Sequence, residues 1–204
     1  MGKKFKIAVL ASGRGSNFQA ILNNIKSGNL DVEINVLISD RKSAKALEIA
    51  RENNIDTIYF NIKEFPSREE FDKAIAEELK RREIDLVCLA GYMKIVGKLV
   101  LDTFKNRIIN IHPALLPSFP GLDAQKQAVE HGVRYSGCTV HFVDEGVDTG
   151  PIILQQVVPV LQNDTDETLA ERILKEEHKL YSKAIDLISK GKVRIEGRKV
   201  FINE

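Results

Sequence analysis

The middle of the chain reads Arg107-Ile108-Ile109-Asn110-Ile111-His112-Pro113-Ala114, an apolar run that ends in polar residues and a proline. Side chains alternate along an extended strand, so we expect Asn110 and His112 on one face while Ile109 and Ile111 point into a core. Pro113 cannot donate a ladder hydrogen bond, and it biases His112 towards an extended conformation. The pattern therefore predicts a buried strand that opens into a rigid loop and presents an amide beside an imidazole.

Further apolar runs alternate with amphipathic stretches along the chain. Helical spacing of apolar residues links Phe18 to Ile25, with Gly28 placed to end that helix, and Ser67 with Glu70 predicts a capping box. This alternation predicts a single α/β domain with a doubly wound, mainly parallel sheet flanked by helices. We expect strands at residues 6–10, 33–38, 56–60, 84–90, 107–111, 135–143 and 151–158, a long helix at 166–189 and a hairpin at 193–202.

Composition and charge narrow the class of protein. The 204 residues are 43% hydrophobic and carry a net charge of +1, so no global field recruits nucleic acid or an anionic membrane. No apolar stretch approaches the ~18 residues of a membrane span, and the N-terminus lacks a signal-peptide pattern. Cys88 and Cys138 each lie in an apolar strand pattern without a Cys-x-x-Cys partner. These features predict a cytoplasmic protein with buried, unbridged thiols.

A glycine-rich turn follows the first expected strand. The turn reads Ala11-Ser12-Gly13-Arg14-Gly15-Ser16-Asn17 and runs into a helix, with Ser16 as a candidate cap. Amide groups at a helix start favour a phosphate, and Arg14 adds a cation. The glycine spacing is neither that of the dinucleotide fingerprint nor that of a Walker A loop. The sequence favours an anion site here over a plain strand–helix turn.

An acidic loop at residues 144–150 supplies candidate partners for the central histidine. If the strands around this loop neighbour the Asn110 strand, Asp148 or Asp144 could reach His112 and hold it protonated. A carboxylate, an imidazole and an amide suit a reaction that develops negative charge on a carbonyl oxygen. No serine or cysteine has a nucleophile-elbow setting, so we expect the substrate to supply the nucleophile. The alternative is a structural histidine beside an ordinary acidic turn.

Two further polar residues fall on apolar faces. Glu177 lies near the centre of the face formed by Leu169, Ile173, Leu180, Ala184 and Ile188 in the long helix. A carboxylate there is either a buried ion pair or a ligand group that faces a cavity, because an unpaired buried charge is too costly. His141 is expected to be a satisfied, half-buried histidine, with a place in the wall of the site as the alternative.

Four segments in this order resemble the glycinamide ribonucleotide formyltransferase family over nearly the whole length. They are Ser12-Gly13-Arg14-Gly15-Ser16-Asn17, Ala90-Gly91-Tyr92-Met93-Lys94-Ile95, Asn110-Ile111-His112-Pro113-Ala114-Leu115-Leu116-Pro117, and residues 137–144 with Asp148-Thr149-Gly150-Pro151-Ile152. The resemblance implies a Rossmann-like formyltransferase fold. It also implies transfer of a formyl group from 10-formyltetrahydrofolate, a consumed cosubstrate, to the amine of glycinamide ribonucleotide in purine synthesis.

The resemblance also assigns roles to individual residues. Asn110, His112 and Asp148 fall on the catalytic trio of the family, with His112 and Asn110 stabilising the oxyanion. Gly15, Ser16 and Asn17 fall on its phosphate-binding turn and Glu177 on a substrate contact. Residues that line the folate pocket are matched by Arg68, Met93, Lys94, Ile95, Val96 and Asn110. Residues 1–105 would then form the nucleotide-binding half and residues 106–204 the catalytic and folate-binding half of one domain, with small molecules as partners and no metal. The enzyme would act as a monomer or homodimer.

One position departs from the family, which usually has a histidine where this chain has Asp123. Asp123 is either a good N-cap for a helix over residues 124–131 or a changed polar contact at the substrate site. Methionyl-tRNA formyltransferase shares part of the pattern, but it carries an Arg-rich continuation and an RNA-binding domain that are not seen here. A 10-formyltetrahydrofolate hydrolase, which usually has an added N-terminal domain, and a non-catalytic folate- or nucleotide-binding protein are the remaining alternatives.

Overall fold

The computed structural model describes residues 4–203; the start of the chain, where the sequence predicts no signal peptide, lies partly outside these residues. The chain divides into two compact units between Ile109 and Asn110. The first contains β1 (Lys6–Leu10), α1 (Ser16–Lys26), β2 (Glu33–Ser39), α2 (Lys45–Glu52), β3 (Asp56–Tyr59), the 3₁₀ turn η1 (Ile62–Glu64), α3 (Arg68–Arg81), β4 (Leu86–Leu89) and α4 (Lys98–Thr103). Strand β5 (Ile108–His112) spans the boundary, and the second unit continues with α5 (Ala124–Glu130), β6 (Tyr135–Phe142), β7 (Ile152–Pro159), α6 (Asp166–Ser189), β8 (Val193–Glu196) and β9 (Lys199–Ile202).

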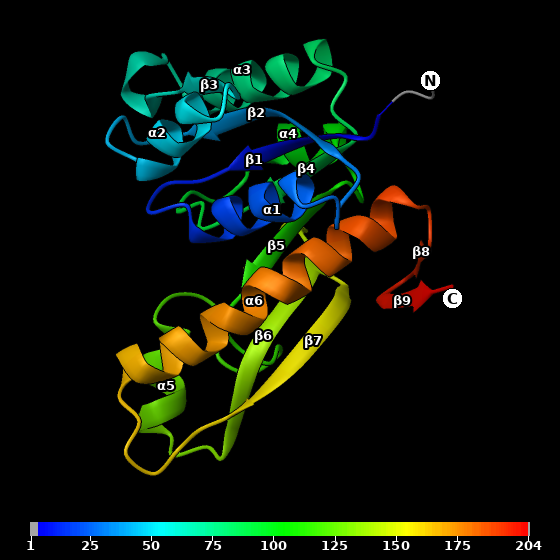
Figure 1. Cartoon of the computed structure of the whole chain (residues 1–204). Coiled ribbons are helices and arrows are strands. Elements are labelled where there is room, and N and C mark those ends of the chain that lie inside the picture. Colours follow the sequence, from blue (N-terminus) through cyan, green and yellow to red (C-terminus); the bar gives the residue numbers. More distant parts are fainter. Residues whose placement is uncertain (1–3, 204) are drawn as a thin grey trace. The chain divides into compact units, whose positions relative to one another are not determined.

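The first unit is built on parallel strands. Strand β1 pairs in parallel with β2 on one side and β4 on the other, and β2 pairs in parallel with β3. The chain therefore moves outward from β1 to β3 and then crosses back to β4. Crossovers between parallel strands are right-handed. The helices on the way out to β3, α1 and α2, therefore cover one face of the sheet, and α3 and α4 cover the other. Helix α1 packs against α2, and α3 packs against α4 (Figure 1).

This reversal of direction determines where a ligand is expected. In open α/β sheets the crevice lies at the carboxyl ends of the strands where the order reverses, here β1 and β4. The strand order in the sheet is β3-β2-β1-β4-β5-β6-β7, with β6 and β7 antiparallel. The predicted α/β fold with a doubly wound, mainly parallel sheet is confirmed.

The second unit is held together by its long helix. Figure 1 shows α6 lying across the antiparallel pair β6 and β7, with α5 beside its first turns. Helix α6 begins at the N-cap Thr165, whose side chain accepts a hydrogen bond from the N–H of Thr168, and it spans the predicted residues. The predicted hairpin at the end of the chain forms as β8 and β9. No helix among residues 4–203 is long and apolar enough to cross a membrane.

The observed N-caps confirm one of the predicted capping residues and differ from two others. Ser67 caps α3 as predicted, accepting a hydrogen bond from the N–H of Glu70. Ser16 does not cap α1, because Gly15 occupies the N-cap position and Ser16 is already the first helical residue. Asp123 stands at the N-cap position of α5, but its side chain makes no capping hydrogen bond, since its backbone is left-handed at φ 57°.

Candidate active site

Strand β5 places the central polar pair as the alternation of side chains predicts. Ile109 is fully buried and Ile111 nearly so, while Asn110 in the middle of the strand is half-buried and His112 at its end is 4% exposed. Asn110 and His112 both face Asp148, so they lie on one side of the strand. The apolar members of the run hold the strand in place, and its polar members form one wall of the site.

Asp148 is the centre of the cluster. Its Oδ2 accepts a hydrogen bond of 2.8 Å from the N–H of Gly121 and lies 3.2 Å from Nδ1 of His112. Its Oδ1 lies 3.4 Å from Nδ2 of Asn110 and 3.4 Å from Nε2 of His141. Burial raises the pKa of the carboxyl, but these donors outweigh burial and hold it below its ordinary value. Asp148 is therefore ionised at neutral pH.

His112 has an acceptor at each ring nitrogen. Nδ1 faces the Asp148 carboxylate, and Nε2 lies 2.8 Å from the carbonyl oxygen of Phe119. Only an imidazolium can donate to both acceptors at once. Burial nevertheless lowers the pKa of His112 below its ordinary value, although Phe119 and Asp148 raise it in part. Desolvation of the cation thus opposes Asp148 and Phe119 in the unliganded protein, and protonation of His112 by Asp148 stays a prediction.

His141 joins the site from β6. It is 2% exposed, and its Nδ1 lies 2.8 Å from the carbonyl oxygen of Phe142. Its Nε2 lies 3.4 Å from the amide nitrogen of Asn110 and 3.4 Å from Oδ1 of Asp148. The histidine expected to be structural therefore belongs to the wall of the site. Asp144, the alternative partner for His112, instead accepts hydrogen bonds from Thr149 and from the N–H of Gly146.

The loop after His112 is braced from β6 and β7. The hydroxyl of Thr139 donates to the carbonyl of Ala114 over 2.7 Å and accepts from the N–H of Leu116 over 3.1 Å. The side-chain amide of Gln155 donates to the carbonyl of Leu116 and to the same hydroxyl. Thr139 and Gln155 are directly paired across β6 and β7, so the sheet itself holds the start of the loop. This bracing fixes the path of the chain towards Phe119 and Gly121.

The glycine turn of the first unit follows β1, as expected. Gly15 is left-handed at φ 77°, and a Cβ there would lie 2.8 Å from Cβ of Ala46. Ser16 and Asn17 open α1, with Asn17 buried. The N–H of Ala46 donates to the carbonyl of Gly13 and ties the turn to α2. Only glycine fits this close approach without strain, and the turn leaves a helix start at the carboxyl end of β1.

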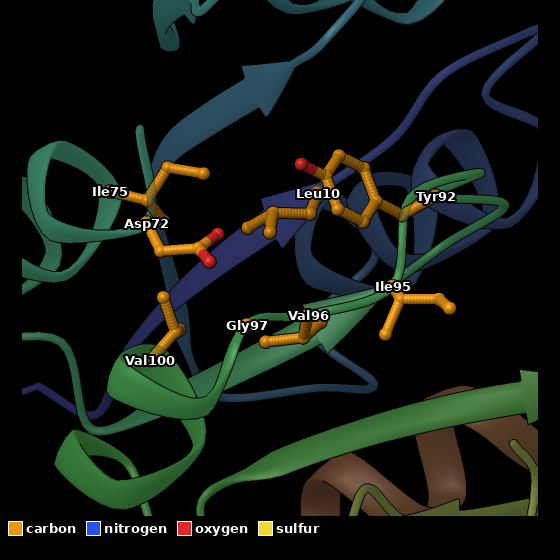
Figure 2. Close-up of a pocket in the computed structure, with 8 residues that line it drawn as sticks. All are labelled: Leu10, Asp72, Ile75, Tyr92, Ile95, Val96, Gly97 and Val100. Atoms are coloured by element: carbon orange, nitrogen blue, oxygen red, sulfur yellow. The ribbon is translucent and has the colours of Figure 1, made fainter. Parts of the chain in front are cut away.

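Residues 93–96 follow β4 in the same unit, next to Arg68. The N–H of Met93 donates to the hydroxyl of Ser12, and the Arg68 guanidinium donates to the carbonyl of Ile95. Ile95 is 70% exposed and Met93 is 56% exposed. Figure 2 shows Ile95, Val96 and Tyr92 along one side of a small pocket whose other walls come from β1, α3 and α4.

A family model described as formyl transferase matches residues 5–185. The chain belongs to the formyl transferase family. It is 46% identical over 180 residues to phosphoribosylglycinamide formyltransferase of Bacillus subtilis, covering 88% of this chain and 92% of the relative. It is 44% identical over 193 residues to the human trifunctional purine biosynthetic protein adenosine-3, of which it covers 19%. The resemblance predicted from the four segments is confirmed.

Solved structures agree with this assignment. The formyltransferase superimposes on glycinamide ribonucleotide transformylase 1 from Symbiobacterium toebii with a TM-score of 0.97 and 53% identity, covering 100% of this chain and 96% of that chain. A formyltetrahydrofolate deformylase from Pseudomonas syringae matches with a TM-score of 0.91 but 25% identity, and this chain covers 67% of it. The lower identity favours the transferase over the hydrolase.

Glu177 is buried on α6 of the formyltransferase, at 6% exposure, as its place on the apolar face predicted. Its charge contributes, after burial itself, to raising the pKa of the Cys138 thiol to about 12. Cys88 and Cys138 are both free and buried, as expected. Among residues 4–203, no group of three or more His, Cys, Asp or Glu side chains is arranged to hold a metal ion.

Proposed function

We propose that this formyltransferase transfers the formyl group of 10-formyltetrahydrofolate to the amine of glycinamide ribonucleotide. The observation that carries the proposal is the cluster of Asn110, His112 and Asp148, which has charge and donors for an oxyanion but no nucleophile of its own. The amine attacks the formyl carbon, the bond from that carbon to N10 breaks, and N10 takes up a proton. The products are formylglycinamide ribonucleotide and tetrahydrofolate.

Charge that develops during the reaction controls the protonation of His112. In the unliganded enzyme its lowered pKa leaves the imidazole mostly neutral at pH 7. As the amine attacks, negative charge on the formyl oxygen adds to that of Asp148, and both favour the imidazolium. His112 therefore accepts a proton from the attacking nitrogen while the oxyanion forms, and returns it towards N10 when the intermediate collapses. The amide of Asn110 donates to the oxyanion, and a single donor of this kind contributes about 3–4 kcal/mol.

Roles for the substrate-binding residues follow from the same proposal. The turn at Gly15, Ser16 and Asn17 binds the phosphate of the ribonucleotide through main-chain amides at the start of α1. Glu177 contacts the ribonucleotide. Folate is bound by the segment after β4, by Arg68 and by Asn110, with main-chain contacts from Met93, Lys94, Ile95 and Val96. Residues 1–105 are the nucleotide-binding half and residues 106–204 the catalytic half. The free, buried thiols support a cytoplasmic enzyme.

The test follows the absorbance change on deformylation of 10-formyltetrahydrofolate by the purified protein, with and without glycinamide ribonucleotide. We expect turnover only when the ribonucleotide is present, and none with His112→Ala under either condition. Equal turnover in the absence of the ribonucleotide would make water the acceptor and the protein a hydrolase. Folate binding without turnover in either condition would make it a binding protein.

A further inference from the structure

One buried carboxylate in the first unit has no part in the chemistry above. Asp72 lies on α3, is 6% exposed, and lines the small pocket together with Tyr92, Val96 and Gly97. Figure 2 shows its carboxylate pointing into this pocket rather than towards solvent. A buried carboxylate is retained at a cost unless its neighbours compensate its charge, so its contacts indicate what it does.

The first contact is with Arg68, one turn earlier on α3. Nε of Arg68 lies 2.9 Å and 3.0 Å from the two carboxylate oxygens of Asp72. The same guanidinium donates through Nη2 to the carbonyl of Ile95. Because the carboxylate fixes the orientation of the planar guanidinium, it also fixes the donor that holds Ile95. Asp72 thus acts on the segment after β4 through Arg68.

The second contact is direct. A Cβ built on Gly97 would lie 1.7 Å from Oδ2 of Asp72 and 2.2 Å from its carboxyl carbon, so the carboxylate packs on the bare backbone of Gly97. Gly97 has an ordinary extended backbone at φ −74° and is the N-cap of α4 without a side chain to cap it. Glycine is therefore needed here for space and not for its conformation. A carboxylate at this place also suits the positive end of the α4 dipole.

These contacts, with the hydrogen bond from Met93 to Ser12, anchor residues 93–97 at both ends and in the middle. We propose that Asp72 is a positioning residue that fixes the main chain of residues 93–97 in the conformation that binds the formyl-folate. The inference rests on the proposed function, which assigns folate to this segment. It predicts that Asp72 determines the affinity for folate and leaves the chemical step and the ribonucleotide site unchanged.

A double-mutant cycle with Asp72→Ala and Gly97→Ala tests the proposal. Each single change removes or displaces the carboxylate, so we expect amide hydrogen exchange at residues 93–97 of the unliganded protein to accelerate about tenfold. The KM for 10-formyltetrahydrofolate should rise about tenfold, while kcat and the KM for glycinamide ribonucleotide change by less than about twofold. The double variant should resemble Asp72→Ala alone, because the added methyl group then occupies the space that the carboxylate left.

Asp102 on the short helix α4, which begins after Gly97, provides a matched control. Asp102→Ala removes a carboxylate whose side chain is 61% exposed and pairs with Lys98. It should leave both the exchange rates and the KM for folate unchanged. If Asp72→Ala does not fold, Gly97→Ala alone still displaces the carboxylate and carries the same expectations.

The outcomes separate this inference from the proposed function. Unchanged exchange at residues 93–97 in folded variants would overturn the positioning role of Asp72 and leave the folate assignment standing. Faster exchange with an unchanged KM for folate would show that Asp72 positions a segment that does not bind folate, and would overturn the assignment instead. Additive effects in the double variant would mean that Gly97 and Asp72 act separately, against the direct packing contact.

Discussion

Replacing Asp148 by asparagine removes one charge from the centre of the site and changes little else. Asp148 has a left-handed backbone at φ 54°, a conformation that asparagine tolerates as well as aspartate. The side-chain oxygen of asparagine can still accept the hydrogen bond from the N–H of Gly121. What is lost is the negative charge that faces His112, together with one acceptor near Asn110 and His141.

The size of the loss follows from the distance. At the 3.2 Å between Oδ2 of Asp148 and Nδ1 of His112, a carboxylate stabilises an imidazolium by about 5 kcal/mol at an effective dielectric of about 20. Both side chains are largely buried, at 12% and 5% exposure, so screening by solvent is weak. Part of the energy is recovered by the dipole of the new amide. We therefore expect a loss of about 3–5 kcal/mol, or kcat lower by roughly a hundredfold to a few thousandfold.

The assay is steady-state formyl transfer at pH 7.5, about one pH unit above the ordinary histidine pKa, with both substrates varied. Asp148→Asn should lower kcat far more than it raises either KM, because the charge acts on the imidazolium that forms during reaction. The control is Asp144→Asn in the same loop, whose carboxylate contacts Thr149 and Gly146 and should cost less than about threefold. Near-full turnover of Asp148→Asn, or a larger loss in Asp144→Asn, would refute the mechanism.

Further predictions concern pH, binding and stability. Burial lowers the pKa of His112, so as the pH is lowered kcat/KM should stay constant past the ordinary histidine pKa of ~6.5 and fall only at lower pH. If kcat/KM instead falls as the pH is raised through this range, His112 must be protonated in the free enzyme. Glu177→Ala should raise the KM for the ribonucleotide about tenfold at nearly constant kcat; an unchanged KM with a lower Tm would assign Glu177 to a structural ion pair. Arg81 and Arg82 lower the pKa of Glu78 from 4.5 to about 2, so Glu78→Gln should lower Tm at pH 7. The Tm of this variant should converge with that of the wild type as the pH falls from about 4.5 to about 2. A difference in Tm that is the same at every pH would contradict this. Asp123→His should keep or raise turnover, because histidine also tolerates the left-handed backbone at φ 57°, and about a tenfold loss would give the aspartate a role of its own.

The sequence predicted best what depends on local periodicity. The alternation of apolar and polar residues placed Asn110 and His112 on one face of β5, and the helical period gave both ends of α6 and the burial of Glu177. It could not assign His141, because the role of that residue depends on its distance from Asp148 across the site. The hydrogen bonds of Thr139 and Gln155 to the loop depend on the register of β6 and β7, and the sequence of either strand alone does not determine that register. The protonation of His112 depends on burial, and the sequence showed only its partners.

The main-chain contacts of the site could not be predicted from the sequence either. They come from the loop after β5, which has an unusual backbone. Phe119, Gly121, Asp123 and Asp148 all have left-handed backbones. Glycine and aspartate adopt this conformation readily, but an aromatic residue such as Phe119, at φ 53°, does so at a cost of about 1 kcal/mol or more. That strained residue presents its carbonyl to Nε2 of His112, and two residues later Gly121 presents its N–H to Asp148. An acceptor on the histidine and a donor on the carboxylate thus come from one tight turn. The turn contacts His112 at the ring nitrogen away from Asp148, and it donates to the same Asp148 oxygen that faces His112, while Thr139 and Gln155 hold the start of the loop.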